Sequence, residues 1–336
     1  MNFTHKMKKE TLLAVLMAAF AITSCQQQKE VTRSQLTPTI LSDSILTMMP
    51  GDLLLADNHI VWSDPFGKEV FLHIHDMDGK EVGSMGKIGK GPKEFVTPSV
   101  RRFCLNNSFV VSSYGTSTKG YLSIDSVLAG KDPFVEISPE EKAVDMMKLE
   151  DDVYMRQTKN GQPTYFISKI NGHEGTFGEY PVEGIQQHVG GNLSYDKERG
   201  LLAFSSFVFP FITLYEKQDD EFKLRAKILP SESTYTIAEG RVNVDRKQKG
   251  GGDIAICKDY VVVLQRDYAT DPTDERTVGR DISKCPRTVF LYNFDLELVR
   301  IIELGMPVMR IAAYPNTNKL YVIGANPEYV LASYEL

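Results

Sequence analysis

Cysteine is scarce in this chain of 336 residues, and the few that occur fit no metal-binding pattern. They are Cys25, Cys104, Cys257 and Cys285. Their spacings match no zinc site, and an odd number remains when Cys25 is set aside. At least one thiol is therefore expected to be free or bonded to another molecule.

The chain also lacks a net positive charge and long apolar runs. The formal net charge is −6, and it becomes −8 when residues 1–24 are left out, because these contain three lysines and one glutamate. Such a charge argues against a nucleic acid partner, since affinity for nucleic acids comes mainly from basic groups on phosphates. Beyond Ile22 no segment is apolar enough to cross a membrane, and no window has a long helical period. The sequence therefore predicts a body made mainly of strands.

The first 24 residues have the parts of a secretion signal. Lys6, Lys8 and Lys9 form a basic start, and the apolar run from Leu12 to Ile22 has the length of a signal-peptide core, too short to span a bilayer. The run ends in the letters ITSC, which resemble the lipobox of bacterial lipoproteins. This resemblance implies that Cys25 is lipidated and becomes the N-terminus. The alternative is an ordinary secretory signal with an incidental cysteine.

Residues 25–36 are expected to be a flexible tether between the lipid and the body, because residues 26–35 are mostly polar and lack periodicity. In lipoproteins an aspartate after the lipidated cysteine favours the inner membrane, so Gln26 indicates the outer membrane by resemblance. We therefore expect a cell-envelope lipoprotein that faces the periplasm or the cell surface. The membrane would be a partner through Cys25, and residues 37–336 would form one domain.

Short apolar or alternating runs recur from residue 37 onward, separated by turns rich in Gly, Asn, Asp and Pro. They form five groups of four and a last group of three, which span Leu53 to Gly86, Val100 to Ser138, Met146 to Val182, Leu193 to Ile228, Asp253 to Gly305 and Met309 to Leu336. The strand missing from the last group is available in Thr37 to Leu46. Groups of four strands with a period of about 40–50 residues are typical of a β-propeller.

We predict an all-β fold, a six-bladed β-propeller whose last blade is closed by an N-terminal strand. A β-sandwich, or a pair of them, is the alternative. It would explain the strands, but neither their repeated grouping nor the incomplete last group.

The stretch from His75 to Phe95, HDMDGKEVGSMGKIGKGPKEF, resembles the TolB-like or NHL-like six-bladed propellers found in many lipoproteins of Gram-negative bacteria. Those proteins carry an Asp-x-Asp-Gly-Lys turn followed by a Gly-x-Gly-Pro-Gly-Glu-Phe loop. Here Lys93 stands where that loop often has its last glycine. The resemblance implies the fold and a lipoprotein, but no particular activity, because this family is largely uncharacterised.

The glycines and lysines of Gly86 to Phe95 also suggest a phosphate-binding loop. A P-loop needs Ser or Thr after its lysine and a helix whose N-terminus binds the phosphate. Neither follows here, and Pro92 removes a backbone donor. We interpret the stretch as the connector between two blades, in which glycines permit positive φ and Phe95 packs between the blades. Glu94 is expected to pair with a lysine or to accept hydrogen bonds from backbone N–H groups.

In a propeller, the connections between blades and the turns between second and third strands share one face, where ligands usually bind. Three unusual segments belong to this face, namely residues 86–99, 229–252 and 268–284. Long loops in a compact domain are often functional, although these are alternatively solvated insertions. The candidate binding residues on this face are Lys87, Lys90, Lys93, Glu94, Arg246, Lys247, Asp267 and Arg276.

Other chemically suggestive residues are interpreted as structural. His73 and His75 point to one side of a strand, a spacing that metal sites use, but no third ligand is evident. Cys257 and Cys285 lie near opposite ends of their predicted strands, too far apart for a disulfide. One aromatic cluster either floors a pocket or, as we favour, packs between blades; it consists of Phe204, Phe207, Phe209 and Phe211.

The sequence has no recognisable Ser/His/Asp motif. We therefore predict a non-catalytic binding or scaffolding module for a peptide, glycan or protein partner, monomeric and without a metal or cofactor. The alternative is a metal-dependent hydrolase or lyase with its site at the channel mouth. A cell-envelope sensor that acts through a partner is a third hypothesis.

Overall fold

The structure is a computed structural model that describes residues 31–43, 45–138, 141, 146–244, 250–271 and 281–336. The chain divides into two compact units, residues 1–32 and residues 33–336. The second unit is built almost entirely of antiparallel strands, with a short helix, α2 (Ile124–Leu128), beside them. In the described part of the chain, no helix is both long and apolar enough to cross a membrane.

The described strands form six sheets of at least four strands, each of which is a blade, and one separate two-stranded sheet. Blade 1 contains β3 (Leu53–Ala56), β4 (His59–Ser63), β5 (Val70–Asp76) and β6 (Glu81–Lys87). Blade 2 contains β7 (Pro98–Leu105), β8 (Ser108–Ser113), β9 (Lys119–Ser123) and β10 (Phe134–Glu136). Blade 3 contains β11 (Met147–Glu150), β12 (Val153–Gln157), β13 (Phe166–Ile170) and β14 (His173–Phe177). Blade 4 contains β15 (Gly191–Asp196), β16 (Leu201–Ser206), β17 (Ile212–Gln218) and β18 (Glu221–Ile228). Blade 5 contains β21 (Asp253–Ile256), β22 (Val261–Leu264), β23 (Thr288–Tyr292) and β24 (Leu298–Glu303). Blade 6 contains β25 (Val308–Ala313), β26 (Lys319–Ala325), β27 (Tyr329–Glu335) and β2 (Thr39–Ser42).

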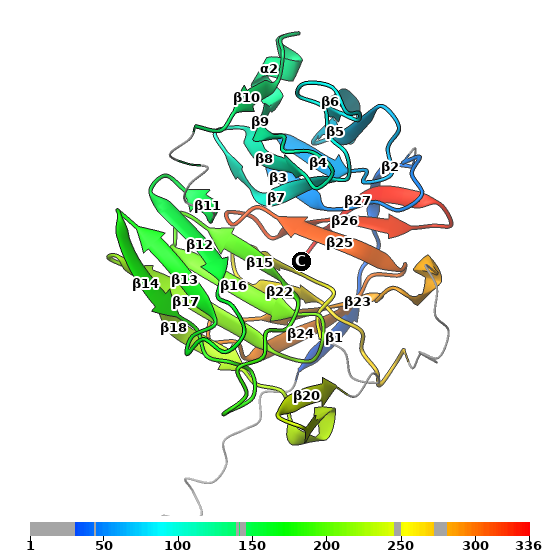
Figure 1. Cartoon of the computed structure of the whole chain (residues 1–336). Helices are drawn as coiled ribbons and strands as arrows, with labels where there is room; N and C mark the ends of the chain where they lie inside the picture. Colours follow the sequence, from blue (N-terminus) through cyan, green and yellow to red (C-terminus); the bar gives the residue numbers. More distant parts are fainter. Residues whose placement is uncertain (1–30, 44, 139–140, 142–145, 245–249, 272–280) are drawn as a thin grey trace, which may run out of the picture. The chain divides into compact units, whose positions relative to one another are not determined.

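The first strand of each blade is the innermost. β3 contacts both β7 and β25, and β21 contacts both β15 and β25, so the first strands surround a central channel. The fold is therefore a six-bladed β-propeller, as predicted (Figure 1). The ring closes as predicted too, because β2 pairs with β27 and completes blade 6 with a strand from the N-terminal side.

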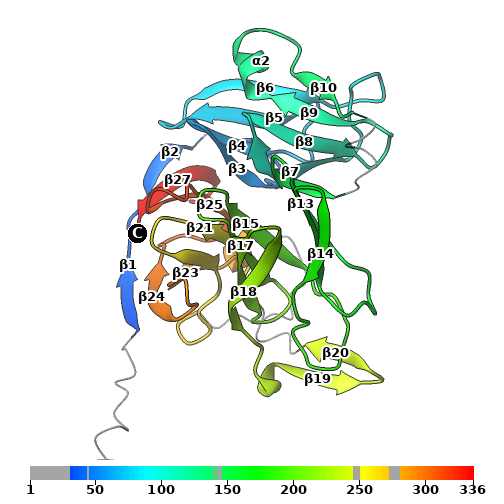
Figure 2. The same cartoon turned by 90° about the vertical axis from the view of Figure 1, so that its left-hand side faces the viewer.

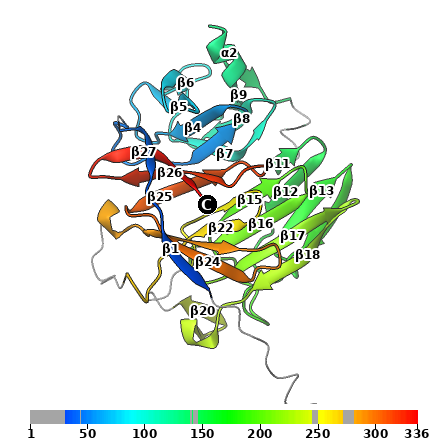
Figure 3. The same ribbon diagram turned by 180° about the vertical axis from the view of Figure 1, so that it is seen from behind.

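A second N-terminal strand extends blade 5. β1 (Thr32–Gln35) is hydrogen bonded to β24 and lies beside it in Figures 2 and 3. The Arg300 Nε donates to Ser34 Oγ at 2.9 Å, and the Leu36 N–H donates to the Glu303 carbonyl at 2.9 Å. The prediction of a flexible tether up to residue 36 is therefore wrong for Thr32–Gln35. Its polar sequence gave no strand signal because pairing along an exposed sheet edge uses backbone groups and needs no apolar alternation.

The core lies between neighbouring blades. Phe204, Phe209 and Phe211 are buried in a cluster between blades 3 and 4, which confirms the core interpretation of the aromatic run for these three residues. Burial of each such side chain stabilises the fold by about 1.5–3 kcal/mol. Phe207 differs, because 48% of its surface is exposed.

Two predicted segments have a different local structure. The predicted third group ends at Val182, but the fourth strand of blade 3 is His173–Phe177, because Asn171 and Gly172 both have positive φ and form a tight hairpin turn after β13. The connection 229–252 contains a hairpin of β19 (Tyr235–Ala238) and β20 (Arg241–Val244). The prediction of a long structureless loop is therefore wrong for that part.

Candidate functional site

The loop 86–95 is a blade connector whose polar groups satisfy one another. Glu94 accepts a hydrogen bond from the Gly91 N–H at 2.8 Å and pairs with Lys87 Nζ at 2.6 Å, so it does both of the things predicted for it. The hydrogen bond from Lys87 and that from Gly91 lower the pKa of Glu94. Phe95 is fully buried and meets Phe71 edge to face, with ring centroids 5.2 Å apart. The interpretation of this loop as a structural connector is confirmed.

The remaining lysines of this loop differ from one another. Lys93 Nζ lies 2.5 Å from Asp132 and 5.9 Å from the centre of the Phe134 ring, so it ties the connector to β10. Lys90 is exposed and forms no ion pair with the described residues. Of the three predicted binding lysines, two therefore already have acidic partners.

Asp267 holds the N-terminal strand in place. It forms an ion pair with Arg33 and accepts hydrogen bonds from the Ala269 N–H and the Thr270 hydroxyl, both at 3.1 Å. Burial alone would raise the pKa of Asp267, but these hydrogen bonds outweigh it and the pKa lies below its usual range. The predicted binding residues Arg246, Lys247 and Arg276 lie outside the described residues.

The predicted histidine pair packs on the tryptophan of blade 1. Trp62 Nε1 donates to His75 Nε2 at 3.0 Å, and His75 Nδ1 lies 2.9 Å from the Gly79 carbonyl. These partners fix one neutral tautomer, with the proton on Nδ1. The His73 ring stacks on the Trp62 ring, with the ring centroids 4.3 Å apart, and His73 Nδ1 lies 3.0 Å from Glu81 Oε1.

The cysteines behave as predicted where they are described. Cys257 and Cys285 are free thiols, and burial raises the pKa of both. The side chain of Cys104 and the whole of Cys25 lie outside the described residues.

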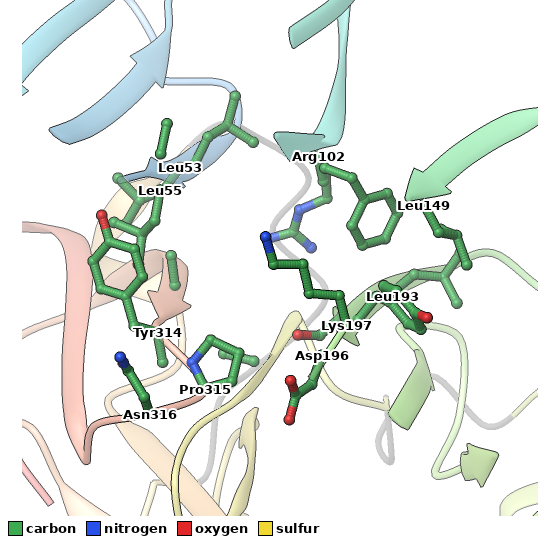
Figure 4. A pocket seen from close by; sticks show the side chains of 18 of the residues that line it. Leu53, Leu55, Arg102, Leu149, Leu193, Asp196, Lys197, Tyr314, Pro315 and Asn316 are labelled. Carbon is green, nitrogen blue, oxygen red and sulfur yellow. The ribbon is translucent and has the colours of Figure 1, made fainter. Parts of the chain in front are cut away.

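A pocket of about 540 Å³ occupies the channel, and all six innermost strands line it (Figure 4). Its lining includes the turns that join the first and second strands in four blades, at residues 56–57, 106–107, 196–198 and 314–316. The pocket therefore opens on the face opposite to the predicted one. A second hollow, of about 680 Å³, lies between blades 3 and 4 beside residues 178–186. Of these two, only the channel pocket is formed by all six blades.

The walls of the channel pocket combine polar groups with aliphatic and aromatic side chains. Leu53, Leu55 and Leu193 stand around it in Figure 4. Phe103 from blade 2 and Tyr195 from blade 4 also line the pocket, and their rings pack edge to face with centroids 6.4 Å apart. The Tyr195 hydroxyl donates to Glu150 at 2.6 Å, and both burial and this hydrogen bond raise its pKa.

A buried ion pair closes the inner end of the pocket. Arg102, which points into the channel in Figure 4, donates to the two carboxylate oxygens of Asp253 at 2.5 and 3.0 Å. Asp253 is fully buried and also accepts from the backbone N–H groups of Ile254 at 2.9 Å and Ile311 at 3.0 Å. One carboxylate thus joins blade 2, blade 5 and blade 6 across the channel.

Asp52 is the second carboxylate beside this arginine, with one oxygen 3.9 Å from Arg102 Nε. Burial raises the pKa of Asp52, although the nearby Arg102 and Arg310 act in the opposite direction. Both carboxylates face a guanidinium, which would repel a metal cation at this level of the channel. Among the described residues, no group of three or more His, Cys, Asp or Glu side chains is placed to hold a metal ion.

The mouth of the pocket carries polar side chains with no internal partner. Within the described part of the chain these groups form no side-chain hydrogen bond or ion pair, and all are exposed: Asp57, Asn106, Lys197, Glu198 and Asn316. They come from blades 1, 2, 4 and 6. We call these five residues the rim. A pocket with aromatic and aliphatic side chains in its walls and unpaired polar groups at its edge suits a ligand that has both kinds of surface.

Comparison with solved structures finds similar proteins of unlike sequence. A calcium-binding protein, regucalcin, from Agrobacterium tumefaciens is 9% identical, with 91% of this chain and 96% of that chain covered and a TM-score of 0.50. The chain is a six-bladed β-propeller. The β-propeller domain of Swd1 from Myceliophthora thermophila is 10% identical, covering 89% and 99% of the two chains at a TM-score of 0.46. A luciferin-regenerating enzyme is 12% identical, covering 89% and 96% at a TM-score of 0.45.

The likeness to regucalcin concerns the fold alone, because the sequence identity is low. No protein-family model matches the sequence. No curated protein matches it either. The function of this propeller must therefore be argued from its own site.

The sequence contains one signal for the channel outside the predicted binding residues. Arg102 and Asp253 are charged residues within predicted innermost strands, and each is followed by an apolar residue. A charge at such a position needs a partner, and in a closed ring that partner comes from another blade.

Proposed function

We propose that this chain is a cell-envelope lipoprotein of the TolB-like or NHL-like type whose propeller binds a ligand in its channel pocket without chemical conversion. The observation that carries the proposal is the pocket itself, with walls from all six blades and an unpaired polar rim. The lipobox-like letters before Cys25 support the anchor. The membrane is then a partner through lipid on Cys25, and the propeller is the part that recognises the ligand.

Binding is favoured over catalysis by the state of the charged groups inside the channel. Arg102 is neutralised by Asp253 and Asp52, so the inner end of the pocket holds a satisfied network. A metal-dependent hydrolase or lyase would need carboxylates and histidines that converge on a cation. The carboxylates that converge here meet an arginine instead.

The anchor is tested by growth with an alkyne-labelled palmitate and fractionation of the cells. We expect lipid label and membrane association for the wild-type chain, and neither for Cys25→Ala. Substitution of the buried Cys257 by alanine is the matched control and should keep the label. A labelled Cys25→Ala chain would contradict the lipidation site.

The binding site is tested by variants that fill the channel from opposite walls. Leu55→Trp from blade 1 and Leu193→Trp from blade 4 each add bulk to the pocket, and Val135→Trp adds the same bulk on the exposed strand β10. Ligand-observed NMR with a fragment library should give hits for the wild type and for Val135→Trp that both channel variants lose. Hits that persist in folded channel variants would show that the channel is not the site.

A further inference from the structure

The rim residues differ in the hydrogen bonds that they can make. Asp57 and Glu198 only accept, Lys197 only donates, and the amides of Asn106 and Asn316 do both. A ligand that satisfies this mixed set must carry groups that donate and accept around its edge. Hydroxyl groups do both.

The charges of the pocket oppose a charged ligand. An anion would meet the carboxylates of Asp57 and Glu198 at the rim, and a cation would meet Lys197 at the rim and Arg102 within. The positive charge of Arg102 is already balanced by Asp253, so an anion gains little by reaching it. A neutral ligand avoids both repulsions.

The aromatic rings of the pocket are held with their carbon surfaces available. The Tyr195 hydroxyl is bonded to Glu150, and the Tyr314 hydroxyl donates to the His59 carbonyl at 3.3 Å. Neither partner lines the pocket, so the polar ends of the two rings are directed away from it. With Phe103, three blades therefore supply aromatic surface to the walls. Aromatic faces carry negative charge and attract the weakly positive C–H groups of a ligand.

The shape of the pocket favours a compact ligand over an extended chain. Six strands surround it, and the pair of Arg102 and Asp253 stands at its inner end. An extended peptide is instead bound along a sheet edge or an open groove. The volume of about 540 Å³ lies within the usual range of small-molecule sites.

We infer that the ligand of the channel is a short neutral saccharide, with its C–H faces against the aromatic walls and its hydroxyls on the rim. This inference rests on the proposed function, because it names the ligand class of the same pocket. A saccharide is neutral, compact and edged with hydroxyls, and its ring carbons form apolar faces. These are the four properties that the rim, charges, walls and shape require.

The experiment uses the full chain purified in detergent on an array of neutral and acidic glycans. Neutral hits are then titrated by calorimetry and by saturation-transfer NMR, with glucuronic acid, glucosamine and N-acetyl-phenylalanine amide as charged and peptide probes. We expect neutral glycans alone to bind, with the strongest magnetisation transfer to ring C–H protons. Leu55→Trp and Leu193→Trp should abolish the binding.

The rim is tested by Asn106→Ala, Asn316→Ala and their combination. Each lost hydrogen bond should weaken binding about fivefold, and the double variant correspondingly more. Asn243→Ala, an exposed asparagine on β20, is the matched control and should bind as the wild type does.

The outcomes separate the two proposals. If fragments bind in the channel but no neutral glycan does, or if the acidic or peptide probes bind instead, the saccharide inference is overturned and the proposed function stands. If a glycan binds equally to folded channel-filling and rim variants, the inference is overturned because the site lies elsewhere. If nothing binds in a channel-dependent manner, the proposed function itself fails.

Discussion

The ion pair between Arg102 and Asp253 should be a major source of stability in the closed ring. Asp253 is fully buried and receives four hydrogen bonds, two of them from Arg102. Arg102→Met keeps much of the arginine's volume but leaves the carboxylate without a counter-charge. Asp52 cannot replace the arginine, because it carries the same charge as Asp253.

The magnitude follows from the burial of the carboxylate. Removal of one partner from a buried pair costs about 3–5 kcal/mol in the free energy of unfolding. In the double variant Arg102→Met with Asp253→Asn, the buried group is neutral and its amide oxygen still accepts from one backbone N–H. One backbone donor then loses its acceptor, at about 1–3 kcal/mol. The double variant should therefore be more stable than Arg102→Met by about 2 kcal/mol.

The assay is unfolding in guanidinium chloride, followed by the fluorescence of Trp62, the single tryptophan of the chain. Arg156→Met, which replaces an exposed arginine on β12, is the control and should change the stability by less than about 0.5 kcal/mol. The reasoning is refuted if Arg102→Met is no less stable than this control. It is refuted too if the double variant is less stable than Arg102→Met alone.

Three further predictions concern other parts of the propeller. Burial raises the pKa of Asp52 in the folded chain above its ordinary value of 3.8. The folded chain therefore binds the Asp52 proton more tightly than the unfolded chain does. Because this proton is lost at higher pH, the free energy of unfolding should fall as pH rises from about 4 through the raised pKa. Asp52→Asn should remove this part of the pH dependence in denaturant titrations, and an unchanged profile would contradict the assignment. Gly86→Ala should destabilise the folded chain by about 3 kcal/mol, because the φ of Gly86 is +81° and an added Cβ would lie 2.2 Å from the Phe71 ring. The control Gly130→Ala, at a residue with φ +67° and no atom near the added Cβ, should cost only about 1–2 kcal/mol. Equal losses of stability in the two variants would rule out the clash with Phe71. Arg33→Ala should cost about 1 kcal/mol, because Arg33 is half exposed, and should speed proteolysis near β1; unchanged cleavage would show that Asp267 does not hold this strand.

The connector 86–95 shows what a local motif predicts well. Its glycines, its proline and Phe95 indicated a turn between blades with a buried aromatic, and the structure has that turn. Backbone conformation at Gly86 and burial of Phe95 depend mainly on neighbours in sequence and in the adjacent blade. The ion-pair partner of Lys93 was not predictable in the same way, because it is Asp132, which precedes the outermost strand of blade 2.

The channel pocket lies on the face opposite to the one for which the sequence predicted binding. The long connections suggested the face of Lys87 and Asp267, whereas the pocket opens beside Asn106 and Asn316. Loop length and charge mark where a chain leaves the sheet, but they do not show where the channel is hollow. The width of the channel depends on side chains from six separate strands, and no single segment records it.

The sequence by itself determined most of the blade strands, their grouping into blades and the closure by β2. These follow from apolar alternation and from turn residues, which act over a few positions. Only the tertiary structure decided which groups meet in the channel and that β1 completes the edge of blade 5. Arg102 and Asp253 are 151 residues apart, and no local pattern pairs them; closure of the ring brings them together, because a buried charge there is stable only against its opposite.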